Sequence, residues 1–159
     1  MKLLVTGGAG FIGSHLCDFL IKHNHSVVIV DNLSSGTLAN LNQVMEEVVF
    51  YNESIEGFDF NKAGHIDVVV HLAAQPSVPL SVTNFGTSSA SNLLGMTSII
   101  EYCRISSTPL IYASSSAIYG NLTMGNDEDS GIDLLSPYAA DKYAMEIYTK
   151  ISYKLYDLS

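Results

Sequence analysis

The chain has 159 residues, of which 47% are hydrophobic and 14% are charged, so it can bury one sizeable core and a single domain is predicted. The 7 Lys and Arg residues against 16 Asp and Glu residues give a formal charge of -9. This charge repels phosphate backbones and anionic lipid, which argues against nucleic-acid or membrane-surface binding and favours a small-molecule ligand.

Five short apolar runs are predicted to form strands. Three of them are continuously apolar rather than alternating, which is typical of strands that are covered on both faces in a parallel sheet. In chain order the five runs are 3–6, 27–31, 48–51, 67–72 and 110–113. The stretches between them are long enough for crossover connections.

Three helices are predicted from apolar residues that recur at helical spacing. Segments 32–47, 52–66 and 121–136 have no such period and are predicted loops. Right-handed crossovers then give an α/β fold with a doubly wound parallel sheet of strand order 3-2-1-4-5, whose ligand lies beyond the carboxyl ends of the strands. The three apolar stripes are Ile12, Leu16, Phe19 and Leu20; Leu93, Met96, Ile100 and Cys103; and Ala140, Ala144, Ile147, Ile151 and Leu155.

No apolar run reaches the roughly 18 to 20 residues that a membrane helix needs, and the first six residues are too few for a signal-peptide core. We therefore expect a soluble, cytoplasmic protein. Cys17 and Cys103 lie far apart in helical patterns and without a CxxC pair. Both are predicted to be buried thiols, and no metal site is expected.

A glycine-rich turn joins the first predicted strand to the first predicted helix, with the sequence TGGAGFIG over residues 6–13. Glycines at this point let a pyrophosphate approach bare backbone, and the N–H groups of the helix start attract its oxygens. The alternative is a turn that only packs the helix on the strand. No Lys-Ser/Thr pair follows the glycines, which argues against an NTPase and favours dinucleotide binding.

Asp31 ends the second predicted strand, where an acid can accept hydrogen bonds from both ribose hydroxyls of a bound adenosine. A carboxylate there repels a 2′-phosphate, and residues 32–39 contain no Arg or Lys to attract one. This favours NAD over NADP. The alternative is an aspartate that caps a helix or a turn.

Tyr138 and Lys142 stand four residues apart on the third predicted helix, so their side chains project from one face. An ammonium near a phenol stabilises the phenolate, which makes Tyr138 a candidate general base, although this spacing also occurs by chance. Residues 114–116 are serines at the carboxyl end of the fifth strand and could hold a reacting oxygen. Asn92 is either a buried polar bridge that supports Lys142 or a helix N-cap.

The whole chain resembles the N-terminal part of an extended short-chain dehydrogenase/reductase of the NAD-dependent nucleotide-sugar epimerase/dehydratase kind. The resemblance implies a Rossmann domain over residues 1–159 that ends before the last strands and without the C-terminal substrate domain. We therefore expect a fragment or an incomplete gene product that is inactive alone. The motifs that carry the resemblance, in the family's order, are TGGAGFIGSHL, VDNLSSG, DVVVHLAAQ, NLLGMT, YASSSAIYG and SPYAADKYAMEIY.

The resemblance also implies the residues of the site. Ser54 stands where the family usually has Asp, which weakens a side-chain contact to adenine and leaves the backbone contact. The expected catalytic residues are Ser115, Tyr138 and Lys142. The expected NAD-binding residues are Gly7, Gly10, Phe11, Ile12, Gly13, Asp31, Asn32, Ser35, Gly36, Ser54, Ile55, Leu72, Ala73, Ala74, Gln75, Asn92, Tyr138 and Lys142.

Ser77, Val78 and Ser116 are the expected contacts to a nucleotide sugar. The stretch from Gln75 to Ser81 is similar to the family's loop that touches the sugar, and a surface loop rich in Ser and Pro describes it equally well. The family further implies a homodimer through the helices that carry Asn92 and Tyr138.

The function that the resemblance implies is epimerisation at C4 of a nucleotide-diphosphate sugar through a 4-keto intermediate. Tyr138 would remove the 4-OH proton, Ser115 would hold the oxygen, and Lys142 would tune Tyr138 and bind the nicotinamide ribose. Residues 115–117 are Ser-Ser-Ala where the related dehydratases have Thr-Asp-Glu, which argues against dehydration. The alternatives are an NAD-dependent decarboxylase or reductase of a sugar nucleotide, and a non-catalytic dinucleotide-binding or dimerisation fragment.

Overall fold

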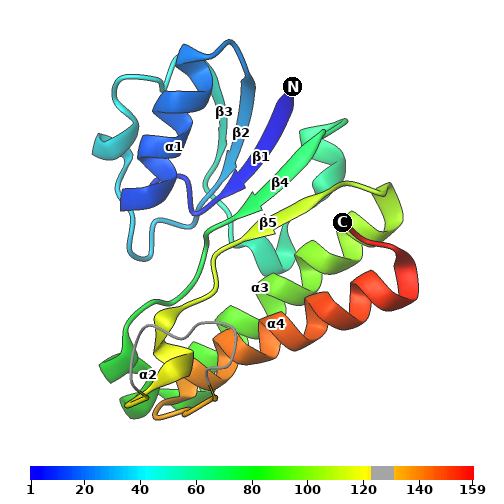
Figure 1. The fold of residues 1–159 in the computed structure, drawn as a ribbon. Coiled ribbons are helices and arrows are strands. Elements are labelled where there is room, and N and C mark those ends of the chain that lie inside the picture. The colour runs from blue at the N-terminus through cyan, green and yellow to red at the C-terminus, as the bar shows by residue number, and fades with distance from the viewer. Residues whose placement is uncertain (123–130) are drawn as a thin grey trace.

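A parallel sheet of five strands forms the centre of the computed structural model, which describes residues 1–122 and 131–159. The order is β3-β2-β1-β4-β5, as predicted, and every neighbouring pair is parallel (Figure 1). All five predicted strands are confirmed, with ends shifted by at most one residue. Their bounds are Lys2–Thr6 (β1), Ser26–Val30 (β2), Val48–Tyr51 (β3), Val68–His71 (β4) and Leu110–Tyr112 (β5).

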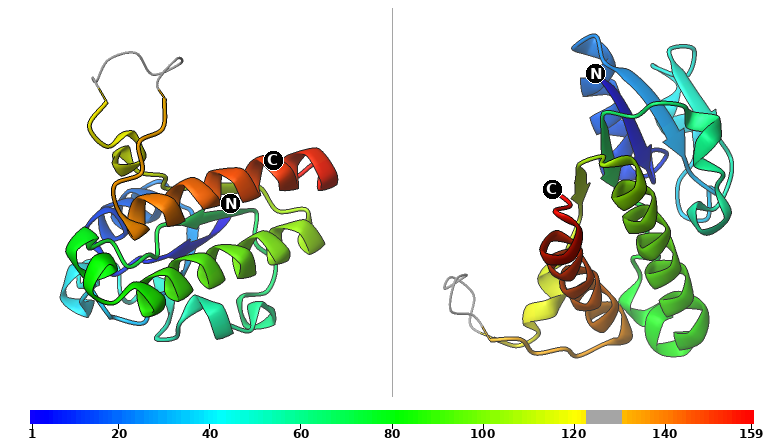
Figure 2. Two further views of the ribbon diagram at one scale, coloured as in Figure 1. Left: turned by 90° about the horizontal axis from the view of Figure 1, so that it is seen from below. Right: turned by 90° about the vertical axis from the view of Figure 1, so that its right-hand side faces the viewer.

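The helices cover the two faces of this sheet. Helix α1 (Phe11–Lys22) packs on one face, and α3 (Phe85–Ser106) packs on the other, with α4 (Pro137–Tyr156) beside it. Figure 2 shows α3 and α4 side by side, running in the same direction. A short helix, α2 (Val78–Thr83), contacts both.

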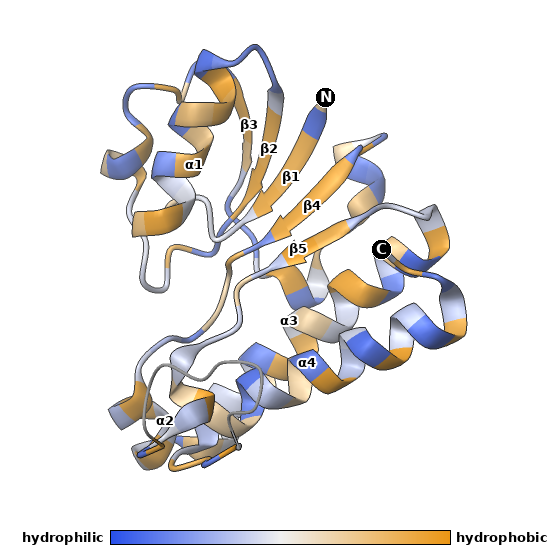
Figure 3. Cartoon of the chain, in the orientation of Figure 1, coloured by the Kyte–Doolittle hydropathy of each residue, from blue (hydrophilic) through white to orange (hydrophobic). Residues whose placement is uncertain are grey.

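Successive residues of each inner strand enter two different cores. Leu3, Val5 and Ile29 pack toward α1, whereas Leu4 and Val28 pack toward α3. Because both faces of these inner strands are covered, their middle residues are apolar on both sides, as the orange colour in Figure 3 shows, while the ends at Lys2, Ser26 and His71 are polar. This double coverage is the physical reason that the continuous apolar runs predicted a parallel sheet.

The predicted loops contain short helical turns. Segments 32–47 and 52–66 hold the 3-10 helices η1 (Leu38–Leu41), η2 (Ile55–Gly57) and η3 (Phe60–Ala63), and a fourth, η4 (Ser116–Tyr119), follows β5. Helix α2 was not predicted, because its Ser/Pro-rich sequence carries no apolar period. Of the predicted loop 121–136, residues 123–130 lie outside the described residues.

The predicted apolar stripe of α1 is confirmed at Leu20, which is buried, and at Leu16, which packs against the same core, and it is wrong at Ile12 and Phe19. Ile12 and Phe19 are 64% and 56% exposed. A Cβ atom on Gly13 would lie 2.2 Å from the carbonyl oxygen of Gly7, so the helix lies against the glycine turn through its small residues. This contact rotates α1 away from the orientation that the apolar period favours. The buried residues of α1 are Gly13, Ser14, Cys17 and Leu20.

The stripe of α3 is confirmed at Met96, Ile100 and Cys103, which are buried, while Leu93 is half-buried. Within this single chain, the stripe predicted for α4 is not a buried face. Its members are exposed or half-buried, with Leu155 at 65%. The side of α4 that faces inward instead carries Ala139, Asp141, Lys142, Met145 and Ser152.

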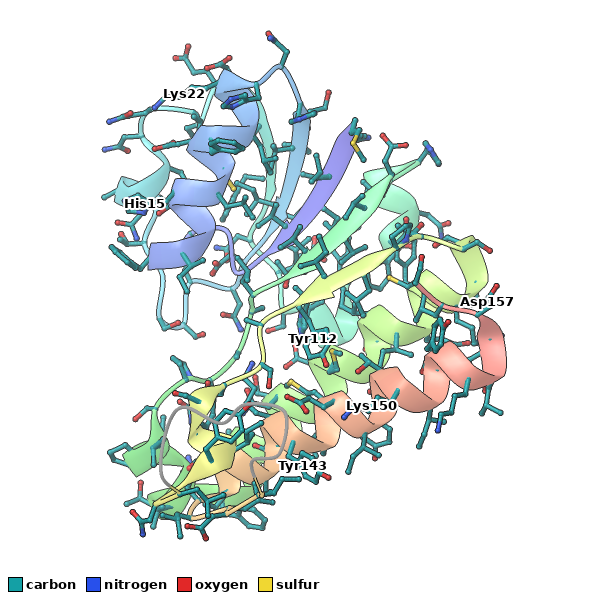
Figure 4. The ribbon with its side chains drawn as sticks, in the orientation of Figure 1. His15, Lys22, Tyr112, Tyr143, Lys150 and Asp157 are labelled. Carbon is teal, nitrogen blue, oxygen red and sulfur yellow. The ribbon has the colours of Figure 1, made fainter. Side chains whose placement is uncertain are left out.

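One polar contact joins α4 to the edge strand. The hydroxyl groups of Tyr112 on β5 and Thr149 on α4 lie 3.0 Å apart, and Figure 4 shows the Tyr112 side chain directed from the strand toward the helices.

Cys17 and Cys103 are buried thiols, as predicted, and burial raises the pKa of each to about 12. Within residues 1–122 and 131–159, no helix has the length and apolar character to cross a membrane.

Candidate active site

A cavity of about 450 Å³ lies at the carboxyl ends of the strands, where the predicted fold expects a ligand. It brings together the glycine turn, the segment after β2, the segment after β4 and the start of α4. Of the residues expected around NAD, its lining contains Gly7, Gly10, Phe11, Ile12, Gly13, Asp31, Asn32, Ser35, Ser54, Ile55, Leu72, Ala73, Ala74, Tyr138 and Lys142. Their contact with NAD stays a prediction.

The glycine turn packs so closely against neighbouring backbone that a side chain would not fit at Gly7. Gly7 has φ +70°, and a Cβ atom on it would lie 2.7 Å from the amide nitrogen of Ala73. Gly10 is the N-cap of α1 and, among the described residues, no side chain caps this helix end. The first-turn residues Phe11, Ile12 and Gly13 line the cavity, and their N–H groups have no acceptor within the helix. They are therefore available as hydrogen-bond donors to a phosphate.

The Asp31 carboxylate is 8% exposed and is held by two backbone amides. The N–H of Ala9 donates to Oδ2 at 2.9 Å, and the N–H of Leu33 donates to Oδ1 at 2.8 Å. Asp31 thus stabilises the turns around it, which was the alternative interpretation. Each oxygen has a second lone pair, so the same carboxylate can also accept from ribose hydroxyls.

Thr6 and His71 form a buried network that the sequence analysis missed. The Thr6 hydroxyl oxygen accepts from the N–H groups of Leu72 and Ala73, each at 3.2 Å, and lies 2.7 Å from Nδ1 of His71. Nε2 of His71, on the other side of the ring, is buried and has no hydrogen-bond partner among the described residues. The network holds the segment after β4 against the glycine turn.

His71 is neutral in this environment. Burial, with a smaller contribution from the charge of Lys142, lowers the pKa of His71 to about 3. The only sequence signal for this residue was its position as the polar end of an apolar strand.

Tyr138 and Lys142 lie on the first turns of α4, as predicted. The helix begins at Pro137, and the Ser136 hydroxyl accepts from the N–H of Ala139 at 3.1 Å. Lys142 Nζ lies 5.9 Å from the centre of the Tyr138 ring and donates to the Ala113 carbonyl at 2.9 Å. A cation thus stands beside the phenol.

Lys142 is buried, with 4% of the residue exposed. Burial lowers the pKa of Lys142, and the neighbouring Asp141 carboxylate opposes this shift. Of the two causes, burial is the larger because it removes the ammonium from water, while Asp141 restores part of the preference for the charged form.

The three serines after β5 occupy different environments. Ser114 lines the cavity, and its hydroxyl donates to Oε1 of Glu146. Ser115 is half-buried outside the lining and caps η4, where its oxygen accepts from the N–H of Ala117 at 3.1 Å. Ser116 is exposed. The proton of the Ser115 hydroxyl is not used by the cap, so its role as a donor to substrate stays a prediction.

Asn92 is a polar bridge and not a helix N-cap. Asn84 is the N-cap of α3, and Asn92 lies in the middle of the helix with 1% exposure. Its Oδ1 accepts from the N–H of Gln75 at 2.8 Å, and its Nδ2 donates to Oδ2 of Asp141 at 3.1 Å. The bridge therefore reaches α4 one residue before Lys142, the residue that it was expected to support.

The other expected residues outside the cavity lining are Gly36, Gln75, Ser77 and Val78. A Cβ atom on Gly36 would lie 2.7 Å from the Ala9 carbonyl carbon, so this glycine permits close packing against the glycine turn. The lining also contains residues that the sequence analysis did not name, although most adjoin named ones in the chain. These are Val30, Ser34, Glu53, Glu56, Pro76, Ser91 and Ala113.

Comparison with known proteins gives the family of this chain. A putative UDP-glucose 4-epimerase of Methanocaldococcus jannaschii is 40% identical, with 98% of this chain and 52% of the relative covered. The structure of a UDP-glucose 4-epimerase from Thermotoga maritima with UDP-glucose superposes with a TM-score of 0.90 at 38% identity, covering 99% of this chain and 53% of that one.

A UDP-glucose 4-epimerase of Thermus thermophilus in complex with NAD gives a TM-score of 0.89 at 36% identity, covering 99% and 52% of the two chains. The chain thus spans about half the length of these relatives. Residues 3–159 match the model of the NAD dependent epimerase/dehydratase family. Because this match covers nearly the whole chain, the chain belongs to the NAD dependent epimerase/dehydratase family.

Proposed function

We propose that the protein to which this chain belongs epimerises a nucleotide-diphosphate sugar at C4, with NAD bound in the cavity. One observation carries the proposal: a single cavity contains both the uncapped start of α1 and the Tyr138–Lys142 pair. A pyrophosphate-binding element and a candidate proton-transfer pair thus share one space. The matches to 4-epimerases support the same reaction.

The residues of the cavity fit NAD. A glycine turn that a Cβ atom would obstruct leaves room for the pyrophosphate, and the helix start supplies N–H donors. Asp31 has acceptor capacity for the ribose hydroxyls, and residues 32–39 offer no cation to a 2′-phosphate. When bound, NAD accepts a hydride from a sugar carbon and returns one to it.

Tyr138 acts as the acid–base group in this proposal. Its phenolate takes the proton of the 4-OH group while that carbon is oxidised, and it returns the proton when the 4-keto sugar is reduced on its other face. Lys142, whose Nζ lies 5.9 Å from the ring centre, places a positive charge beside this phenol. Ser115 donates its hydroxyl proton to the oxygen at C4.

A non-catalytic dinucleotide-binding module is the second candidate. The observation in its favour is that Ser77, Val78 and Ser116, the expected sugar contacts, lie outside the cavity lining. In this case NAD binds to the cavity and no sugar nucleotide turns over.

The exposed side of α4 supports a homodimer through α3 and α4. Ile147 and Ile151 are 41% and 45% exposed, and Leu94 on α3 is 56% exposed. Apolar side chains that are exposed along two neighbouring helices are typical of a helix–helix interface. We include this dimer in the proposed function.

The test removes the hydroxyl group of the candidate base. Tyr138→Phe, made in the protein as its gene encodes it in full, is expected to reduce the kcat for UDP-hexose epimerisation by about 10² to 10⁴. The Kd for NAD should stay within about threefold, since the phenyl ring remains. Tyr143→Phe is the matched control, because Tyr143 lies on the same helix outside the cavity lining.

Normal turnover by Tyr138→Phe would refute the catalytic role. If the unaltered protein binds NAD but produces no epimer, the non-catalytic candidate replaces the proposed one.

A further inference from the structure

Ser81 is fully buried, although it belongs to the stretch that resembles the family's sugar-contacting loop and was also described as a surface loop. Its exposure is 0%, and it lies in the short helix α2. The Ser81 hydroxyl donates to the carbonyl of Val78 at 2.7 Å and accepts from the backbone N–H of Tyr138 at 3.2 Å. The hydroxyl is therefore hydrogen-bonded to two backbone groups of the protein and is not a ligand contact.

The N–H of Tyr138 needs such a partner. The first amides of a helix have no carbonyl within the helix to donate to, and they take acceptors from caps or water. The hydroxyl of Ser136, the N-cap of α4, accepts from Ala139. The Tyr138 amide receives its acceptor from a different helix, which is Ser81 of α2.

This contact joins two parts of the proposed site. On one side is the start of α2, where Ser77 and Val78 are the expected sugar contacts; the Ser77 hydroxyl accepts from the N–H of Leu80 at 3.2 Å and so caps α2. On the other side is the backbone of Tyr138, the proposed base. One oxygen atom, that of Ser81, is bonded to both.

We propose that Ser81 is a positioning residue, whose hydroxyl fixes Tyr138 at the depth where its phenol meets the C4 oxygen of a sugar held by the start of α2. The proposal rests on the proposed function. A reacting group that is displaced by a fraction of an ångström loses rate while most of the binding contacts stay in place. Loss of the Ser81 hydroxyl should therefore lower kcat more than it changes cofactor affinity.

The experiment compares two side chains of the same shape, Ser81→Thr and Ser81→Val, in the protein as its gene encodes it. Both add a methyl group to the same buried position, and only Thr keeps a hydroxyl. Helix α2 already accommodates the required geometry at Thr83, whose hydroxyl donates to the Pro79 carbonyl at 3.2 Å.

We expect the kcat of Ser81→Val to be at least about tenfold below that of Ser81→Thr, with the Kd for NAD equal in the two. Ser136→Ala is the control for a purely structural effect, because it removes the other cap from the same end of α4. It should lower the thermal midpoint and leave kcat within about threefold of the unaltered protein.

Equal kcat values for Ser81→Thr and Ser81→Val would overturn the proposal, as would an equal loss of kcat in Ser136→Ala. If the extra methyl prevents folding, Ser81→Ala against Ser136→Ala gives the same comparison without added volume. Full turnover by Tyr138→Phe would instead refute the proposed function. A low kcat in Tyr138→Phe together with equal Thr and Val variants would refute only the role of Ser81.

Discussion

The glycine turn offers a direct test of how the cofactor cavity is built. In Gly13→Ala, the new Cβ atom would lie 2.2 Å from the carbonyl oxygen of Gly7 and 2.7 Å from Cα of Gly8. Both contacts are with backbone, which cannot move aside as a flexible side chain can. The start of α1 and the turn must therefore separate.

The size of the effect follows from these distances. Real Cβ atoms essentially never come within 3.0 Å of another heavy atom, so the backbone must separate by somewhat under an ångström. Overpacking of this kind costs about 1–3 kcal/mol, against which alanine regains at most about 1 kcal/mol of helix propensity. We expect a net loss of about 1–2 kcal/mol in the free energy of unfolding.

The same displacement affects cofactor binding. Hydrogen bonds from the α1 amides to a phosphate have a narrow optimum near 2.9 Å, so a shift of nearly an ångström removes most of their contribution. We expect the Kd for NAD to rise at least about tenfold, which corresponds to about 1.4 kcal/mol.

Urea titration and calorimetric NAD titration measure the two quantities. The matched control is Gly86→Ala, since Gly86 is also in the first turn of a helix and a Cβ atom on it has no heavy atom within 4 Å. That variant should be unchanged or more stable by up to about 1 kcal/mol. If Gly13→Ala matched Gly86→Ala in both stability and NAD affinity, the close approach of α1 to the turn would not shape the cavity.

Two further predictions concern the buried histidine and the exposed face of α4. The pKa of His71 is about 3 in the folded protein against an ordinary 6.5, so acid protonates the unfolded chain first, and stability is lost as pH falls from 6.5 toward 3. In urea titrations, lowering the pH from 7 to 4 should therefore shift the stability difference between the unaltered protein and His71→Asn by about 3 kcal/mol in favour of the variant; a pH-independent difference would contradict the neutral, buried imidazole. Ile151→Asp, on the exposed side of α4, should convert the proposed homodimer into monomers in sedimentation equilibrium while the thermal midpoint of the monomer changes little, and a dimer of undiminished affinity would exclude this face as the interface.

The sheet could be predicted from the sequence because its signals are local. The runs around Leu4, Val28 and Val69 are continuously apolar, which already implies cover on both faces, and right-handed crossovers then leave few possible orders. The glycine turn was equally readable, since a strand, closely spaced glycines and a helix start occur there in unbroken succession.

The orientation of the helices could not be read in the same way. Apolar period alone gives the side of a helix that prefers burial, but the contact between Gly13 and the Gly7 turn decides the rotation of α1. On α4 the period indicated Ile151 and Leu155, yet the inward side is the one that carries Lys142. Both errors arise because a helix face that serves a site need not be its most apolar face.

Side-chain partners far apart in sequence were the least predictable part of the site. Nothing near Ser81 in the chain indicates that its hydroxyl accepts from an amide 57 residues later. The bridge from Asn92 to Asp141 spans 49 residues, and only its existence was foreseen. Such partners follow from the packing of α2, α3 and α4 around one another, which no local pattern contains.

The interior beside α4 contains buried polar side chains, although burying them costs stability. Lys142 and Asp141 are each 4% exposed, and taking ionisable side chains out of water costs stability unless they are hydrogen-bonded. The structure compensates Lys142 with the Ala113 carbonyl and Asp141 with the Asn92 amide, which limits the cost without removing it. Stability alone would favour a leucine at position 142, where the helix packs on the sheet. A lysine there fits the role proposed for it beside Tyr138, and that requirement ties the packing of α4 to the chemistry proposed for this pair.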